Sequence, residues 1–164
     1  MFNQEVKKLQ NYNQEVQKFF IDLMVNDDKF NTINDILHWY NLSFMGVTSE
    51  RLTPGSYNFL NNNFPETMKT LQNGCKPDYM PSWIKINHCE KRKEACNFHD
   101  FLYWIAWPRK ASDKLFIKRM NQVCKGFGNK IYNYSFYWVV RAFGQTAYSD
   151  EEKTLDDFFM LVLD

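Results

Sequence analysis

Two ionisable residues on the apolar faces of consecutive predicted helices constrain the fold of this chain most strongly. In the run CNFHDFLYW, His99 shares a helical face with Cys96 and Tyr103. Further along the chain, Asp113 shares a helical face with Phe116. Burying a lone carboxylate is costly, so Asp113 needs a polar partner. The helical spacing offers His99 as that partner.

The two helices are predicted to run antiparallel on either side of a short turn. The first extends from about His88 to Trp104, and Pro108 is typical of the first turn of the second. His99 and Asp113 then each lie five residues from the turn, which is roughly 7.5 Å along the helix axes. The two side chains are therefore expected to face each other at the same level.

The rest of the chain also has the pattern of helices joined by loops. Pro54 and three consecutive asparagines indicate loops between Thr48 and Pro65. The aromatic segment from Ile131 to Phe143 favours a helix over a strand because of its length and the glycine that follows it. Gly126 and Gly128 are predicted to end the second helix of the central pair. Further helices are predicted at residues 3–25, 35–45, 65–73 and 131–143. A short helix in the tail is predicted to begin at Ser149 as its N-cap.

These elements predict a mainly α-helical single domain over residues 1–164, with an antiparallel helix pair at its centre. An N-terminal helical region covers residues 1–72, the core covers residues 73–148, and a tail helix lies within residues 149–164. Hydrophobic residues make up 45% of the chain and aromatic residues 18%, which favours a packed core over disorder.

Charge and hydropathy exclude two classes of function. The net charge is +1, so no overall field favours nucleic acid as a partner. No apolar stretch reaches the ~20 residues of a membrane-spanning helix, and the N-terminal MFNQEVKKLQ has no signal-peptide pattern. The aromatic run at residues 132–138 is interpreted as core, and the basic run at residues 91–93 as a solvated helix face.

The predicted His99–Asp113 pair is suited to proton transfer. A carboxylate that accepts from one imidazole nitrogen fixes the tautomer and leaves the other nitrogen as a base for a water molecule. Tyr103, one turn along from His99, can donate its hydroxyl to the second oxygen of Asp113. Asp100 points out of the helix pair, and a carboxylate there suits a calcium ion. His99, Asp113 and Tyr103 are thus the candidate catalytic residues, and Asp100 is the candidate metal ligand.

These residues carry a resemblance to secreted phospholipases A2. His99 and Asp100 are followed by Tyr103, Cys96 stands three residues before the histidine, and a helix with a buried aspartate comes next. In that family the equivalent of His99 activates water, that of Asp100 binds calcium, and those of Tyr103 and Asp113 orient the histidine. The resemblance implies a calcium-dependent esterase that acts on phospholipids, although the glycine-rich calcium loop of the family is absent here.

The chain also resembles a family of phage and prophage proteins of uncharacterised function. Its members show a proline loop with an aromatic residue, then HDxLY, (A/S)DxxF and VRxxG. Here these are PSW at 81–83, HDFLY at 99–103, SDKLF at 112–116 and VRAFG at 140–144, within residues 77–148. This resemblance implies a phage virion or the host cytoplasm as location. As an alternative to hydrolysis, this resemblance implies that the chain is a virion or tail component that binds phage structural proteins or copies of itself.

Two alternatives to catalysis stay open for His99. It can be a core histidine that Asp113 satisfies without any chemistry. It can also belong to a zinc site, whose candidate ligands are Cys75, His88, Cys89, Cys96 and His99.

The cysteines can instead form two disulfide bonds. In the predicted register Cys89 comes level with Cys124, whereas Cys96 and Cys124 are offset by about 12 Å and cannot be joined.

Overall fold

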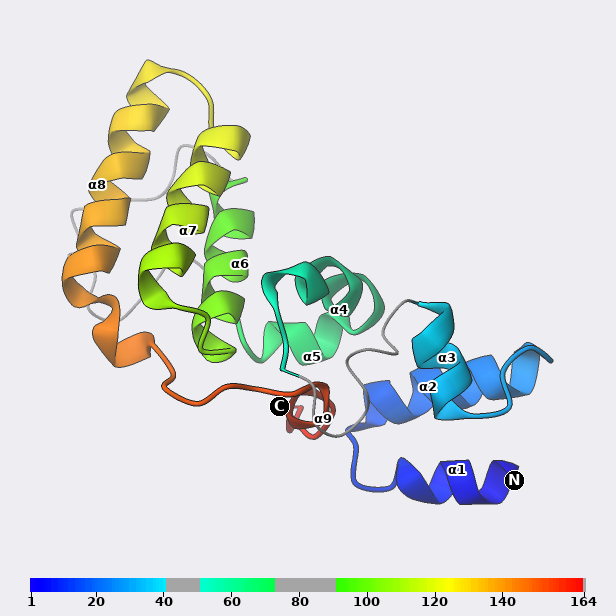
Figure 1. The fold of residues 1–164 in the computed structure, drawn as a ribbon. Coiled ribbons are helices and arrows are strands. Elements are labelled where there is room, and N and C mark those ends of the chain that lie inside the picture. Colours follow the sequence, from blue (N-terminus) through cyan, green and yellow to red (C-terminus); the bar gives the residue numbers. More distant parts are fainter. Residues whose placement is uncertain (41–50, 73–90, 164) are drawn as a thin grey trace. The chain divides into compact units, whose positions relative to one another are not determined.

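The computed structural model describes residues 1–40, 51–72 and 91–163. These residues are mainly helical, as predicted, and an isolated bridge between Arg51 and Thr154 is their only β pairing. The chain divides into two compact units, Met1–Thr70 with Lys153–Asp164, and Leu71–Glu152 (Figure 1). None of the described helices combines the length and the apolar character needed to cross a bilayer.

The first unit is built from short helices around an aromatic core. Phe64 and Phe159 are fully buried, and their ring centroids lie 5.6 Å apart. The C-terminal segment joins this unit through a hydrogen bond from the Leu52 backbone N–H to the Lys153 carbonyl at 2.7 Å. The elements of the first unit are α1 (Phe2–Lys8), α2 (Gln14–Asn26), α3 (Ile33–Trp39), η1 (Pro54–Ser56), α4 (Tyr57–Asn63), α5 (Pro65–Lys69) and α9 (Leu155–Phe159).

Three predictions for this unit are corrected. The single helix over residues 3–25 is two helices, because the side chain of Asn13 accepts a hydrogen bond from the backbone of Val16 and starts α2 there. The asparagine-rich stretch forms α4 rather than a loop, since burial of Leu60 on one helical face outweighs weak helix propensity. The N-cap residue of the tail helix is Thr154, not Ser149 as predicted.

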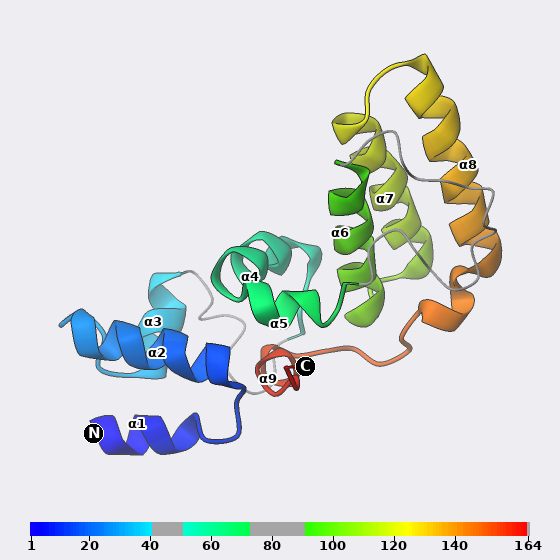
Figure 2. The ribbon, with the colours of Figure 1, turned by 180° about the vertical axis from the view of Figure 1, so that it is seen from behind.

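The second unit consists of α6 (Arg92–Trp104), α7 (Arg109–Val123), α8 (Phe127–Phe143) and η2 (Gly144–Ala147). The views from the front and from behind agree that α7 lies between α6 and α8 (Figures 1 and 2). Glu94 pairs with Arg119 at one end of α6, and His99 contacts Asp113 nearer the other, so α6 and α7 are antiparallel, as predicted. The predicted start of the first helix, near His88, lies outside the described residues.

The turn between α6 and α7 has a helix-ending hydrogen-bond pattern. The Trp107 N–H donates to the Leu102 carbonyl at 3.0 Å, and the Ala106 N–H donates to the Tyr103 carbonyl at 3.2 Å. Ala106 adopts the left-handed conformation, with φ of 54°, at the position that glycine usually takes. The turn therefore has no glycine to mark it in the sequence.

The connection from α7 to α8 differs in detail from the prediction. Helix α7 ends at Val123, Gly126 adopts φ of 101° immediately before α8, and Gly128 lies inside α8. The helical interpretation of residues 131–143 is confirmed, and α8 starts earlier, at Phe127. A positive φ suits a residue without Cβ, so Gly126 serves as the break between the two helices.

Two surface and core predictions are wrong in part. Within the basic run, Arg92 is fully buried and donates to Asn133 Oδ1 at 2.9 Å, so the run is not wholly a solvated face. Within the aromatic run, Phe136 is buried, but Tyr134 and Trp138 are exposed. Helix α8 therefore presents apolar side chains on two opposite faces.

Candidate functional site

A buried histidine–aspartate contact joins α6 to α7. His99 Nε2 lies 2.8 Å from Asp113 Oδ1, which confirms the predicted contact. Asp113 is fully buried and His99 is only 6% exposed. The contact forms because both residues fall on the faces along which the two helices pack.

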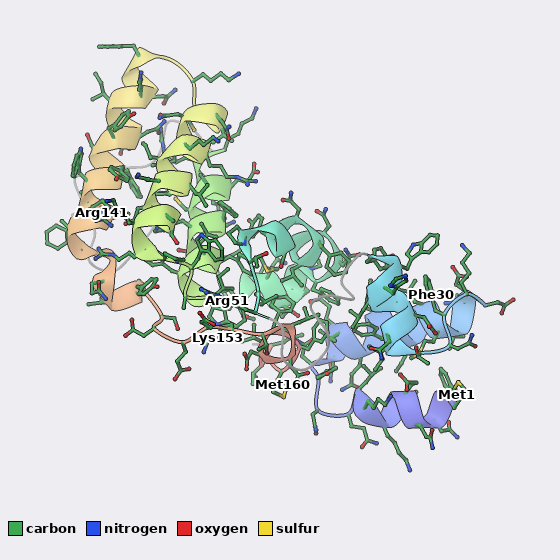
Figure 3. The ribbon with its side chains drawn as sticks, in the orientation of Figure 1. Met1, Phe30, Arg51, Arg141, Lys153 and Met160 are labelled. Atoms are coloured by element: carbon green, nitrogen blue, oxygen red, sulfur yellow. The ribbon has the colours of Figure 1, made fainter. Side chains whose placement is uncertain are left out.

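The carboxylate of Asp113 has two further partners. The Tyr103 hydroxyl donates to Oδ1 at 2.7 Å, and Arg141 Nη1 donates to Oδ2 at 2.6 Å. Tyr103 thus shares an oxygen with His99, and the predicted bond to the second oxygen is wrong because Arg141 occupies it. Arg141 comes from α8, where Figure 3 labels it, so the site needs all three long helices.

Arg109 ties the site to the end of α8. Its Nη2 donates to the carbonyls of Val140 and Arg141, at 3.2 and 2.7 Å, and its Nε lies 3.4 Å from the Tyr103 hydroxyl. A guanidinium at a helix C-terminus satisfies carbonyls that have no partner within the helix. Arg109 consequently fixes the level at which Arg141 meets Asp113.

Three of the four motifs quoted from the sequence meet at this one place, and the fourth, PSW at 81–83, lies outside the described residues. Phe116 stacks on the imidazole of His99, with ring centroids 4.5 Å apart. A Cβ added to Gly144 would lie 3.0 Å from the Tyr103 hydroxyl, so the absence of a side chain there lets η2 approach the site. The HDFLY, SDKLF and VRAFG segments therefore each contribute residues to a single polar cluster within apolar packing.

Burial and hydrogen bonding set the protonation states. Burial lowers the pKa of His99, against the opposing effect of Asp113. Burial alone would raise the pKa of Asp113, but hydrogen bonds from His99, Arg141 and Tyr103 hold it below its ordinary value. At neutral pH this makes Asp113 a carboxylate and His99 a neutral imidazole. Because a carboxylate only accepts, Nε2 of His99 carries the proton.

The other ring nitrogen of His99, Nδ1, is the atom that can act as a base. Nδ1 makes no hydrogen bond to any of the described residues. A neutral imidazole nitrogen with a lone pair can accept a proton from water or a hydroxyl group. The arrangement can therefore act as a general base whose tautomer the carboxylate fixes.

Asp100 lies on α6 with intermediate exposure. Across residues 1–40, 51–72 and 91–163, no group of three metal-ligating side chains comes together. The described donor set thus does not by itself form a calcium site around Asp100.

The cysteines of the described part are both disulfide-bonded. Cys96 on α6 and Cys124 at the end of α7 form disulfides. Cys75, His88 and Cys89, together with the predicted Cys89–Cys124 pairing, lie outside the described residues. A disulfide sulfur is not a thiolate, so Cys96 is not available as a zinc ligand.

The site residues that the sequence did not reveal are cationic or small. Arg141 is a charged residue within an apolar segment, but the sequence does not identify Asp113 as its partner. Arg109 gave no signal of its own, and Gly144 was marked only as the glycine after a helix and as part of the VRAFG motif, because the contacts of both residues depend on how α8 packs. A hollow of about 400 Å³ at the start of α8, lined by Gly126 and Tyr132 among others, does not include His99.

Comparisons with protein-family models, curated proteins and solved structures found no match to this chain.

Proposed function

We propose that the chain is a hydrolase of lipid esters in which His99 activates a water molecule. The observation that carries the proposal is the orientation of the imidazole. Asp113 accepts from Nε2 at 2.8 Å, and Nδ1 is left without a hydrogen bond within the described residues. The resemblance of residues 96–113 to secreted phospholipases A2 supports an ester of a phospholipid as substrate.

The proposed reaction is balanced by one water molecule. Nδ1 of His99 takes a proton from water while the water oxygen bonds to the ester carbonyl carbon. The tetrahedral intermediate then expels the alcohol oxygen, which takes the proton back from His99, leaving a carboxylic acid and an alcohol. Asp113 stays ionised throughout and stabilises the imidazolium, as the hydrogen bonds from Arg141 and Tyr103 favour its charged form.

The role of calcium in the proposed reaction is open to direct test. Asp100 is the ligand that the resemblance names, and its role is tested by removing its charge. No step of the reaction above is assigned to the ion.

An ester-hydrolysis assay on His99 variants tests the proposal. Wild type, His99→Gln and Asp100→Asn proteins are compared on phospholipid dispersions and on soluble esters, with calcium or with a chelator. His99→Gln is expected to reduce the rate by about 10²-fold or more, the usual effect of losing a general base. His38→Gln, which alters an exposed histidine on α3, serves as the matched control and should keep the wild-type rate.

The proposal fails if folded wild-type protein is inert on every ester, with and without calcium. The polar cluster would then support the second candidate function, a phage virion or tail component that keeps the helical scaffold. The near-complete burial of His99 favours that alternative, because a structural histidine needs no route to solvent.

A further inference from the structure

Helix α8 carries a row of exposed apolar side chains opposite its buried face. We call this row, made of Phe127, Ile131, Tyr134 and Trp138, the α8 stripe; its members are 82%, 56%, 43% and 66% exposed. They recur at spacings of four, three and four residues, so they follow one another along a single side of the helix. At 100° per residue this side is turned away from buried Phe136.

The α8 stripe is a continuous row of apolar side chains rather than a scatter of single ones. Its members span roughly 16 Å of helix. Scattered single apolar residues are normal on protein surfaces, whereas contiguous apolar patches mark surfaces that bind something. A helix that is apolar on two opposite sides is typically covered on both. The core of the unit covers one side, and the stripe is the other.

The ionisable Lys, Arg, Asp and Glu residues in the segment of chain that carries the stripe have a single sign of charge. Between residues 114 and 149 there are six Lys and Arg residues and no Asp or Glu, although the whole chain has a net charge of only +1. Arg119 and Arg141 pair with Glu94 and Asp113. Lys125 and Lys130, at the start of α8, are exposed and form no ion pair with the described residues. This charge complements an anionic surface and disfavours a second copy of the same helix.

The residue types favour a lipid surface as the anionic partner. Tryptophan and tyrosine have an apolar body and a polar tip, which suits the boundary between headgroups and acyl chains. Apolar residues along one side of a helix, with lysines beside them, are typical of helices that lie in that boundary. We propose that the α8 stripe lies on an anionic lipid bilayer, with Ile131 and Trp138 among the acyl chains and Lys125 and Lys130 at the headgroups.

The α8 stripe ends next to one member of the polar cluster. Arg141 follows Trp138 by one helical turn and donates to Asp113 at 2.6 Å. Binding itself needs no hydrolysis, so the docking surface stands independently of the proposed reaction.

Vesicle co-sedimentation of the full-length protein tests this surface. Wild type is expected to bind vesicles of phosphatidylcholine mixed with phosphatidylglycerol, and to bind pure phosphatidylcholine much more weakly. Ile131→Asn combined with Trp138→Gln should lower the partition coefficient at least about tenfold, since apolar area is withdrawn from the bilayer. Lys125→Gln and Lys130→Gln should each lower it about fivefold.

The control variant is Val162→Asn, because Val162 is an apolar residue of the other unit that is 80% exposed. It should bind vesicles like wild type. Measurements in the His99→Gln background separate binding from hydrolysis. A folded wild-type protein that binds vesicles but does not hydrolyse any ester would contradict only the proposed reaction.

Three outcomes would overturn the lipid assignment. The first is that wild type does not bind anionic vesicles, and the second is that the stripe substitutions leave binding unchanged. The third is that wild type does not bind vesicles but forms a concentration-dependent dimer, which the stripe substitutions abolish. The last result, seen by light scattering, would make a second copy of the chain the occupant of the stripe.

Discussion

Asp113 is the residue on which the second unit's polar interior depends. Its two oxygens receive hydrogen bonds from three side chains, on α6 and on α8, while its own backbone belongs to α7. A buried carboxylate with fewer partners would tend to take up a proton or draw in water. With these partners it stays charged, and it holds the side chains of the three helices at one level.

Replacing Asp113 should therefore cost much more than replacing an exposed aspartate. Asp113→Ala leaves His99, Tyr103 and the charge of Arg141 without their acceptor, and we expect the free energy of unfolding to fall by about 3–5 kcal/mol. Urea denaturation measures this loss. Asp150→Ala, at an exposed position, should change stability by less than about 0.5 kcal/mol. Equal small effects of the two substitutions would mean that the cluster does not form.

The lowered pKa of His99 predicts that acid destabilises the protein before any carboxylate titrates. Because the folded state holds this proton less tightly than the unfolded state, stability is full above the ordinary histidine pKa of about 6.5 and falls as the pH drops below it. Asp113, whose pKa is also lowered, adds a loss of the same sign at lower pH, below its ordinary value of about 3.9.

Denaturation between about pH 7.5 and 5.5 checks this sign, because His99 is expected to lower the free energy of unfolding as the pH falls through this range. His99→Gln should flatten the pH dependence. Stability that rises on acidification would instead mean that Asp113 holds His99 protonated in the folded state.

At the level of single residues, the sequence was sufficient where spacing along one helix decided the contact. His99 and Tyr103 lie one turn apart on α6, and the short turn at Pro108 brings Asp113 level with them. Arg141 required knowledge of how a third helix packs, which no local pattern contains. The buried Arg92 was missed for the same reason, since its acceptor Asn133 lies on α8.

At the level of elements, the C-terminal end of α8 is held close to α6. The Tyr148 hydroxyl donates to the Ala106 carbonyl, and the Ser149 N–H donates to the Tyr103 carbonyl, at 3.3 and 3.2 Å. Helix periodicity predicted α7, and the length of the aromatic segment with the glycine after it predicted α8, which begins earlier than expected, at Phe127. Periodicity failed at the first helix boundary, where one asparagine cap interrupts an otherwise continuous apolar pattern.

Two glycines of this region should respond oppositely to alanine. In Gly144→Ala the new Cβ would lie 3.0 Å from the Tyr103 hydroxyl, which Asp113 holds in place, and we expect a loss of about 1 kcal/mol or more. Gly128→Ala, in the first turn of α8 with nothing within 4 Å, should stabilise the protein by up to about 1 kcal/mol. Thermal and urea denaturation measure both.

A double substitution identifies the cause of the Gly144 effect. If the clash with the tyrosine hydroxyl is responsible, Tyr103→Phe combined with Gly144→Ala should cost less than the sum of the single changes. Additive losses would place the strain elsewhere in η2.

At the scale of the whole molecule, the chain forms two compact units with separate cores. The sequence predicts one domain with a tail that begins at residue 149. In the structure the segment from Lys153 onward belongs with Met1–Thr70, where Phe159 is fully buried. Apolar residues in a tail predict that it docks, but the surface that receives it is fixed by contacts more than 100 residues apart in the sequence, such as Tyr12 with Asp156. No local pattern encodes such contacts.

Separate cores predict separate local stabilities. Phe159→Ala and Phe136→Ala each remove a ring that is no more than 1% exposed, from the first and second unit respectively, and each should cost about 3–5 kcal/mol locally. In hydrogen exchange, Phe159→Ala should lower the protection of α2 and leave that of α6 and α7 close to wild type, and Phe136→Ala should do the reverse. If either substitution lowered protection throughout the chain, the two units would unfold as one cooperative body. Hydrogen-exchange protection of α8, the helix proposed to bind vesicles, would then measure the stability of the whole protein rather than that of the second unit.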